Sequence, residues 1–320
     1  MQRWRGLVAV PPDWGRCVVT IGVFDGVHRG HAEIIGKAVA LADARGVPSV
    51  LLTFDPHPSE VVRPGSHPPA LTTLVRRAEL VEELGIDVFC ALPFTLAFSR
   101  LRPAEFVHEA LVADLHAAEV IVGENFRFGA KASGDVGTLV ELGATFGFGA
   151  HGIPLLRGAT AAEEQVISAT YVRSCVEAGD MGAAAAALGR PHRLDGLVER
   201  GDQRGRELGF PTANLRTGPY PAVPADGVYA GRAVRLDEWG RTVAAPPLGL
   251  AAISIGTNPT FEGRQRRVEA YLLDFDGDLY GQKIGLEFAR RLRGQERYDD
   301  LAALVAQMRD DVKQTRALLT

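Results

Sequence analysis

The stretch CVVTIGVFDGVHRGHAEIIGKAVALADARG, residues 17–46, joins a strand pattern, a glycine-rich turn and a helix pattern. The apolar run of residues 17–24 predicts a buried strand, and apolar residues then recur at helical spacing from residue 30 to a stop at Gly46. Strand and helix patterns alternate as far as residue 123, which is typical of parallel strands joined by crossover helices. The N-terminal part of the chain is therefore predicted to be an α/β fold with a parallel sheet.

The pattern changes after Pro191, where short strand-like segments such as residues 227–237 and 266–275 follow one another with turns between them. Consecutive strands of this kind predict an antiparallel barrel or sandwich. A helix pattern closes the chain. Its apolar face, which we interpret as core packing against the barrel, comprises Leu301, Leu304, Val305, Met308 and Val312. With a boundary near residues 186–193, the expected domains are 1–187 and 188–320.

Length, charge and cysteine content argue against a nucleic-acid-binding, disulfide-rich or membrane-spanning protein. The 320 residues suffice for two domains, and the net charge of −4, spread along the chain, gives no broad basic surface for nucleic acid. Cys17, Cys90 and Cys175 lie far apart, which fits a reducing cytoplasm better than disulfides or a thiolate zinc site. Apolar runs stay well short of the roughly 20 residues that cross a bilayer. We expect a soluble, cytoplasmic protein without a membrane partner, and the sequence does not exclude an oligomer.

The turn after the first buried strand carries His28 and His31, directly before the helix pattern. In an open α/β sheet, ligands bind beyond the carboxyl ends of the strands, where helix N-termini present N–H groups to anions. Two imidazoles there can hydrogen-bond the phosphates of a nucleotide and stabilise a departing pyrophosphate. The two histidines could instead bind zinc, which needs at least one further ligand. They could also be surface residues at a turn with no ligand. The two histidines alone leave these three hypotheses open.

Three further segments follow predicted strands or begin a helix. TFDPHP, residues 53–58, ends the second strand, and VGENFRFG, residues 122–129, ends a later one. ISATYVR, residues 167–173, begins a helix with hydroxyl side chains and an arginine, a combination that suits a triphosphate. Each segment alone is also explained as a turn, an aromatic loop or a helix cap.

The C-terminal part carries GDQRGRELGFPTANL, residues 201–215. Three glycines four residues apart allow backbone N–H groups to approach phosphates closely, and the hydroxyl of Thr212 and amide oxygen of Asn214 are hard ligands suited to Mg²⁺. We interpret this segment as a nucleotide-binding loop. Glu269, in the strand-like segment 266–275, is by itself as well explained as a charge facing solvent.

GVFDGVHRGH, residues 22–31, resembles the G-x-F-D-x-x-H-x-G-H signature of the nucleotidyltransferase superfamily. Together with the three segments above it resembles the flavin adenylyltransferase module of bacterial bifunctional riboflavin kinase/FAD synthetases. The resemblance implies a Rossmann-like domain in which His28 and His31 are catalytic. It implies ATP or phosphate contacts at Gly22, Phe24, Asp25, Gly30, Ser168, Thr170 and Arg173. It implies flavin contacts at Asp55, His57 and Asn125. Ala169 stands where that family usually has a hydroxyl residue.

Residues 201–215 resemble the G-x-x-x-G-x-x-L-G-F-P-T-A-N motif of riboflavin kinases, and the similarity continues through DGVYAG, SIGTNPTF and VEAYLLDFDGDLYG to the final helix. It implies a β-barrel kinase domain with Glu269 as the catalytic base and Mg²⁺ at Thr212 and Asn214. It implies phosphate contacts at Gly201, Gly205 and Gly209. Residues 290–300 are either a mobile lid near the flavin or a solvated charged stretch.

The whole chain is therefore expected to phosphorylate riboflavin with ATP to FMN, and then to join FMN to the AMP of a second ATP, releasing pyrophosphate and forming FAD. Both steps are expected to need Mg²⁺. Two alternatives stay open: a nucleotidyltransferase that acts on another acceptor, and a flavin- or nucleotide-binding regulatory protein in which one or both sites do not turn over.

Overall fold

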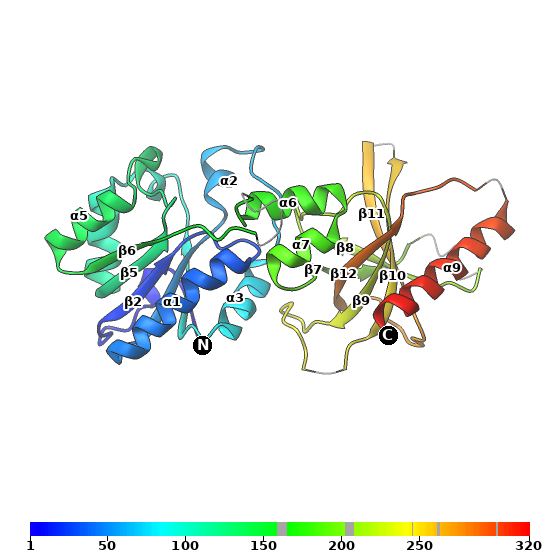
Figure 1. The fold of residues 1–320 in the computed structure, drawn as a ribbon, viewed down its shortest axis with the longest axis horizontal. Coiled ribbons are helices and arrows are strands. Elements are labelled where there is room, and N and C mark those ends of the chain that lie inside the picture. The colour runs from blue at the N-terminus through cyan, green and yellow to red at the C-terminus, as the bar shows by residue number, and fades with distance from the viewer. Residues whose placement is uncertain (159–164, 202–207, 245, 261–262, 299) are drawn as a thin grey trace. The chain divides into compact units, whose positions relative to one another are not determined.

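The computed structural model describes residues 1–158, 165–201, 208–244, 246–260, 263–298 and 300–320 (Figure 1). Contacts within the chain divide it into two compact units. Unit 1 comprises Met1–Pro68 and Arg77–Ser168, and unit 2 comprises Pro69–Arg76 and Ala169–Thr320.

Unit 1 is built on a six-stranded sheet with the strand order β1-β4-β3-β2-β5-β6. Every neighbouring pair in this sheet is parallel, which confirms the predicted parallel α/β fold. The strands are β1 (Gln2–Arg5), β2 (Cys17–Ile21), β3 (Ser49–Asp55), β4 (Val88–Pro93), β5 (Ala117–Gly123) and β6 (Gly149–Ile153). All five residues of β2 are buried, as expected for a central parallel strand with both faces covered.

The α- and π-helices between these strands are α1 (Arg29–Arg45), α2 (Pro58–Val62), α3 (Leu74–Glu83), α4 (Pro103–Phe106), a π-helical segment (Val107–Asp114) and α5 (Val136–Phe146). Helix α5 contacts β6 at one edge of the sheet. Helix α1 contacts β2, β3 and β5, and its buried Ala38 and Ala42 pack with Val18 of β2 and Ile121 of β5. Gly46 ends α1 in the left-handed conformation with φ 64°, as its position in the sequence predicts.

Unit 2 contains α6 (Ala169–Ala178) and α7 (Met181–Leu188), followed by a closed antiparallel barrel with the strand order β10-β11-β8-β7-β12-β9. Its strands are β7 (His192–Glu199), β8 (Thr212–Thr217), β9 (Gly227–Arg235), β10 (Gly249–Thr260), β11 (Gly263–Leu272) and β12 (Lys283–Arg293). The barrel, rather than the sandwich, is thus the observed arrangement. The last helix, α9 (Leu301–Leu319), contacts β9, β10 and β12 (Figure 1).

The apolar face of α9 is less buried than its sequence pattern predicts. Leu301 is 60% exposed, and Leu304, Met308 and Val312 are only half-buried. The buried residues of this helix are Asp311 and Thr315. The reason is a cavity that separates part of the apolar face from the barrel, described below.

No helix in the described part of the chain combines the length and the apolar content that crossing a membrane would require.

Candidate active sites

The turn between β2 and α1 has an unusual backbone. Phe24, Gly26 and Val27 have φ values of 51°, 78° and 39°. A positive φ is rare for a β-branched residue such as Val27, and strain of this kind persists where the surrounding structure enforces it, often at functional sites. This turn ends at His28, the N-cap residue of α1.

His28 and His31 are held together at the start of α1. The Nδ1 atom of His28 accepts a hydrogen bond from the backbone N–H of His31 at 3.3 Å, and the two rings stack with centroids 3.6 Å apart. Phe24 contacts the His31 ring edge-on at 5.1 Å. A neutral imidazole that accepts through Nδ1 carries its proton on Nε2, so Nε2 of His28 is a donor for an anion.

The glycines of this turn leave room for the rings. A Cβ on Gly30 would lie 3.3 Å from the His28 ring and 3.3 Å from the carbonyl oxygen of Ile167, and one on Gly22 would lie 3.1 Å from the Phe24 ring. Asp25 is only 2% exposed and forms an ion pair with Arg77 of α3 at 3.6 Å. This placement favours a role for Asp25 in holding the strained turn.

The sheet order brings the other predicted residues of unit 1 to the same edge. Strand β2 lies between β3 and β5, so residues that follow these three strands lie along one carboxyl edge. Asp55 ends β3, and His57 caps α2 by accepting a hydrogen bond from the Ser59 N–H at 3.1 Å. Asn125 is exposed two residues after β5.

Aromatic residues lie within or after β3, β4 and β5, and sequence reasoning missed all of them except the two in residues 122–129. Their rings form a continuous chain of contacts with centroids 5.5 to 6.1 Å apart. The members are Phe54, Phe94, Phe98, Phe106, Phe126 and Phe128. The available signal was the placement of phenylalanines within or directly after three predicted strands. Four of them, Phe54, Phe94, Phe98 and Phe126, are half-buried, so this edge of the sheet presents aromatic surface as well as polar groups.

The residues predicted for the triphosphate are divided between the two units. Ser168 is the last residue of unit 1, whereas Thr170 and Arg173 belong to unit 2. Thr170 is exposed in the first turn of α6, and the Nε atom of Arg173 donates to the carbonyl oxygen of Pro69 at 2.7 Å. Ala169 is the first residue of that helix.

A zinc site at the two histidines would need further ligands. Across the residues that the structure describes, no three His, Cys, Asp or Glu side chains are grouped so as to hold a metal ion. The stacked pair therefore has donors for an anion but no described set of ligands for zinc.

Unit 2 contains a cavity of about 270 Å³ between the barrel and α9. The barrel contributes polar and aromatic side chains, among them Thr212, Ser254, Glu269 and Tyr271. Helix α9 contributes Leu304, Met308, Asp311 and Val312. The helix side of the cavity is therefore mostly apolar, with the Asp311 carboxylate paired to Arg293, and the barrel side carries the carboxylate of Glu269.

Glu269 is placed by the register of three strands. In β11 it lies directly opposite Asn214 of β8 on one side and Ser254 of β10 on the other. Tyr271, two residues along, lies opposite Thr212 and faces the same side because side chains alternate along a strand. The structure thus brings Glu269, Thr212 and Asn214 together on adjacent strands, as a shared site requires.

The glycines of the predicted phosphate loop have separate structural roles. A Cβ on Gly201 would collide with the side-chain amide of Asn214, so only glycine leaves that amide in place. Gly209 has a φ of 80°, which favours glycine at this turn before β8. Gly205 lies outside the described residues.

The segment after β12 forms part of the cavity wall. Residues 290–293 belong to β12, and the Nε2 atom of Gln295 donates to the Ser254 hydroxyl at 3.0 Å and to the Ile255 carbonyl at 2.8 Å. These two bonds attach the segment to β10 beside the strand that carries Glu269.

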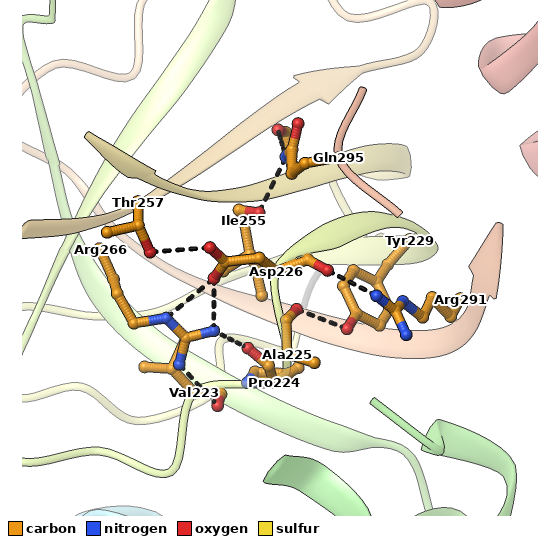
Figure 2. A network of polar contacts seen from close by, with 11 residues as sticks. Val223, Pro224, Ala225, Asp226, Tyr229, Ile255, Thr257, Arg266, Arg291 and Gln295 are labelled. Atoms are coloured by element: carbon orange, nitrogen blue, oxygen red, sulfur yellow. Dashed lines mark hydrogen bonds and ion pairs between the residues drawn. The ribbon is translucent and has the colours of Figure 1, made fainter. Parts of the chain in front are cut away.

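A second polar network joins β10 and β11 at Thr257 and Arg266 (Figure 2). The carboxylate of Asp226, just before β9, accepts a hydrogen bond from Thr257 at 2.7 Å and two from Arg266 at 2.9 and 3.1 Å. Thr257 and Arg266 are directly opposite each other on β10 and β11. Asp226 therefore joins the two strands three residues from the Ser254–Glu269 pair. Burial alone would raise the pKa of Asp226, but the hydrogen bonds from Thr257 and Arg266 and the charge of Arg266 outweigh it and lower the pKa.

Replacing Asp226 with asparagine is expected to lower the melting temperature by roughly 2 °C at pH 6. The folded-state pKa of Asp226 is lowered, so its stabilisation is complete above the unfolded pKa of about 3.9 and is lost as the pH falls through the lower folded value. Melting curves of the parent and Asp226→Asn between pH 6 and 3 should therefore converge toward the acid end. A difference that stays constant over this range would contradict the role of the carboxylate.

The chain is similar to known proteins over each of its two halves and over its whole length. Residues 10–171 match the family described as FAD synthetase, and residues 188–319 match the family described as riboflavin kinase. The chain is 36% identical over 302 residues to a bifunctional riboflavin kinase/FMN adenylyltransferase of Listeria monocytogenes, covering 94% of this chain and 91% of that protein. A protein of the same name from Pseudomonas fluorescens is 36% identical over 319 residues, covering 99% of this chain and 98% of that protein.

A solved structure described as a macrolide-efflux protein from Streptococcus pneumoniae has the same fold, with a TM-score of 0.85 at 27% identity and 99% of each chain covered. The two family matches are consecutive, since the first spans β2 to β6 and the second spans the barrel and α9. Both named relatives match over nearly their full length, so the similarity includes the order of the two domains. The chain belongs to the bifunctional riboflavin kinase/FMN adenylyltransferase family.

Proposed function

We infer that this chain makes FAD from riboflavin in two steps, each at its own site. The observation that carries this inference is the match of two consecutive segments to the two enzyme families, together with one fitting site in each segment. We assign FMN adenylyl transfer to a domain of residues 1–187 and riboflavin phosphorylation to a domain of residues 188–320. Neither the alternative acceptor nor the binding-only role is favoured by any of these observations.

In the kinase domain, Glu269 is the general base. Its carboxylate accepts the proton of the 5′-hydroxyl of riboflavin while the hydroxyl oxygen attacks the γ-phosphorus of ATP, so that FMN forms and ADP leaves. The position of Glu269 in the cavity wall supports this role. The apolar side chains of α9 on the opposite wall suit the flat ring system of a flavin. Gly201, Gly205 and Gly209 are proposed to let the backbone approach the phosphates of ATP.

Thr212 and Asn214 are proposed to hold Mg²⁺ in the kinase domain. Hydroxyl and amide oxygens are hard ligands of the kind that Mg²⁺ accepts alongside water and substrate phosphates. The residues fit this role because the two side chains lie on the strand next to Glu269, and Gly201 leaves space at the Asn214 amide. When bound, the ion neutralises charge on the transferred phosphate.

In the adenylyltransferase domain, His28 and His31 bind the phosphates of ATP through ring N–H groups at the start of α1. A phosphate oxygen of FMN attacks the α-phosphorus, FAD forms and pyrophosphate leaves, and the donated hydrogen bonds stabilise the charge that develops on it. Gly22, Phe24 and Gly30 shape the turn so that an anion can approach the helix N-terminus, and buried Asp25 holds it.

The remaining predicted residues are assigned by their place along the chain. Asp55, His57 and Asn125 are proposed to contact the flavin, and their place at the carboxyl edge beside the aromatic residues supports this. Ser168, Thr170 and Arg173 are proposed to contact phosphates, with Ala169 unable to supply a further hydroxyl. The partners are then the small molecules riboflavin, FMN and ATP. A cytoplasmic location is proposed because all three cysteines are free thiols.

Incubation with riboflavin, ATP and Mg²⁺, followed by chromatography of the flavins, tests the function. FMN and then FAD should appear in succession. Chelation of Mg²⁺ with EDTA should lower both rates by at least about a hundredfold, because phosphate charge is then not neutralised. Absence of both products in the presence of Mg²⁺ would contradict the function, and FMN without FAD would contradict its second half.

A further inference from the structure

An ion pair between a buried aspartate and a mostly buried arginine joins α9 to the barrel at the kinase cavity. The guanidinium of Arg293, the last residue of β12, donates from Nε and Nη2 to the two carboxylate oxygens of Asp311 at 2.9 and 2.8 Å. Gln307 adds a third hydrogen bond to Asp311 at 3.1 Å. Asp311 is only 4% exposed, and its hydrogen bonds with Arg293 raise the pKa of the guanidinium. This is a fixed, two-point connection between helix and strand.

The position of this ion pair at the cavity indicates a role in substrate binding as well as in stability. Arg293 and Asp311 both line the cavity. A buried ion pair contributes little net stability compared with apolar side chains of similar size, because both charges lose their hydration. It does impose a defined geometry, since the paired N–H groups match the carboxylate oxygens in one orientation.

The ion pair fixes the position of α9 where apolar packing does not, because part of the apolar face of this helix has no contact with the barrel. Leu304, Met308 and Val312 line the cavity and are half-buried, so the apolar contacts that usually hold a helix in place are incomplete where the cavity lies. Asp311 precedes Val312 directly and lies within one turn of Met308. A shift of α9 at Asp311 would therefore move the apolar wall of the cavity.

We propose that Arg293 and Asp311 are positioning residues that hold α9 at the distance at which its apolar face binds the flavin ring. The proposal rests on the kinase function inferred above for the same cavity. The ligand class that follows is a flat, largely apolar ring system placed between α9 and the barrel wall that includes Phe210 and Tyr271. ATP is expected to be bound elsewhere, by the glycine-rich loop.

This assignment predicts which kinetic constant changes. Helix α9 carries none of the residues proposed for proton transfer or for phosphate binding. Misplacing it should raise the KM for riboflavin and leave the KM for ATP and kcat nearly unchanged, because substrate and transition state lose the same contact. A pair that serves only global stability would instead reduce the amount of active enzyme, which lowers apparent kcat without changing KM.

The test compares Asp311→Asn with Asp274→Asn. Asp274, which follows β11, forms an ion pair with Arg316 of α9 at 2.8 Å. That pair is exposed, and neither partner lines the cavity. Asp311→Asn should raise the KM for riboflavin about tenfold or more. Asp274→Asn should change it by less than about twofold. The rate of FAD formation from supplied FMN, measured on the same preparations, should be equal in the parent and both variants, which would show that the change is confined to the kinase reaction.

Arg293→Lys keeps the test decisive if Asp311→Asn does not fold, since lysine retains the charge but cannot make the two-point contact. It should raise the KM for riboflavin less than Asp311→Asn does. Because the two residues act as one unit, the double variant should be no worse than Asp311→Asn alone. An unchanged KM for riboflavin in folded Arg293→Lys or Asp311→Asn, or an equal rise in Asp274→Asn, would overturn the proposal. A parent enzyme that makes no FMN would instead contradict the kinase function itself.

Discussion

Replacing His28 and His31 together with alanine is expected to abolish FAD formation from FMN, while riboflavin is still phosphorylated at close to the parental rate. The variant lacks the two imidazoles that stack at the start of α1, and with them the donors proposed to stabilise the departing pyrophosphate. Loss of even one preorganised donor of this kind costs on the order of 100- to 1000-fold in rate. The double change should therefore lower adenylyl transfer by at least about 1000-fold.

The measurement is the rate of FAD formation from FMN and ATP, with FMN formation from riboflavin measured on the same sample. His28 is also the N-cap of α1, so a second variant separates stability from chemistry. His28→Asn keeps a side-chain acceptor for the His31 N–H but has no group equivalent to Nε2–H, and should be folded yet inactive in transfer. His108→Ala, which removes an exposed histidine of the same unit, should leave both rates unchanged. Normal FAD formation by the double alanine variant would rule out the assigned role.

Glu269→Gln is expected to lower riboflavin phosphorylation by roughly 100- to 10,000-fold, the usual contribution of a positioned general base. Glutamine has the same shape and can still accept a hydrogen bond, but it cannot take the proton of the 5′-hydroxyl. Formation of FAD from supplied FMN should stay at the parental rate, because that step is assigned to His28 and His31.

Glu287→Gln is the matched control. Glu287 is a half-buried carboxylate on β12 of the same barrel, and it does not line the cavity. Initial rates of FMN formation at saturating riboflavin and ATP should fall in Glu269→Gln and remain unchanged in Glu287→Gln. FMN formation by Glu269→Gln at the parental rate would show that Glu269 is not the base.

Local patterns in the sequence predicted most of unit 1. The apolar run before residue 24 and the helical spacing up to Gly46 correspond to β2 and α1, because each depends on neighbours within a few residues. The alternation of strands and helices predicted the parallel sheet. The strained backbone at Val27 could not be predicted, since nothing in the residue type favours a positive φ there.

Features that depend on contacts between distant segments were beyond local patterns. Alternation along a strand shows which side chains share a face but not whether the sheet closes, so the pattern alone left barrel and sandwich open. The resemblance to riboflavin kinases implied the barrel, and the structure confirms it. The apolar stripe of α9 predicted a contact with the barrel but not that a cavity lies in between. The pairing of Arg293 with Asp311 connects a strand to a helix beyond an intervening segment, and neither residue carries a signal that names its partner.

If one chain carries two chemically independent sites that act in succession, two variants that each lack one site should complement each other when they are mixed. Riboflavin, ATP and Mg²⁺ are given to the double variant His28→Ala/His31→Ala, to Glu269→Gln, and to an equal mixture of the two. The histidine variant is expected to stop at FMN, Glu269→Gln is expected to leave riboflavin unchanged, and the mixture is expected to make FAD. A mixture that makes no FAD, although each variant retains its own half-reaction, would contradict the presence of two independent sites.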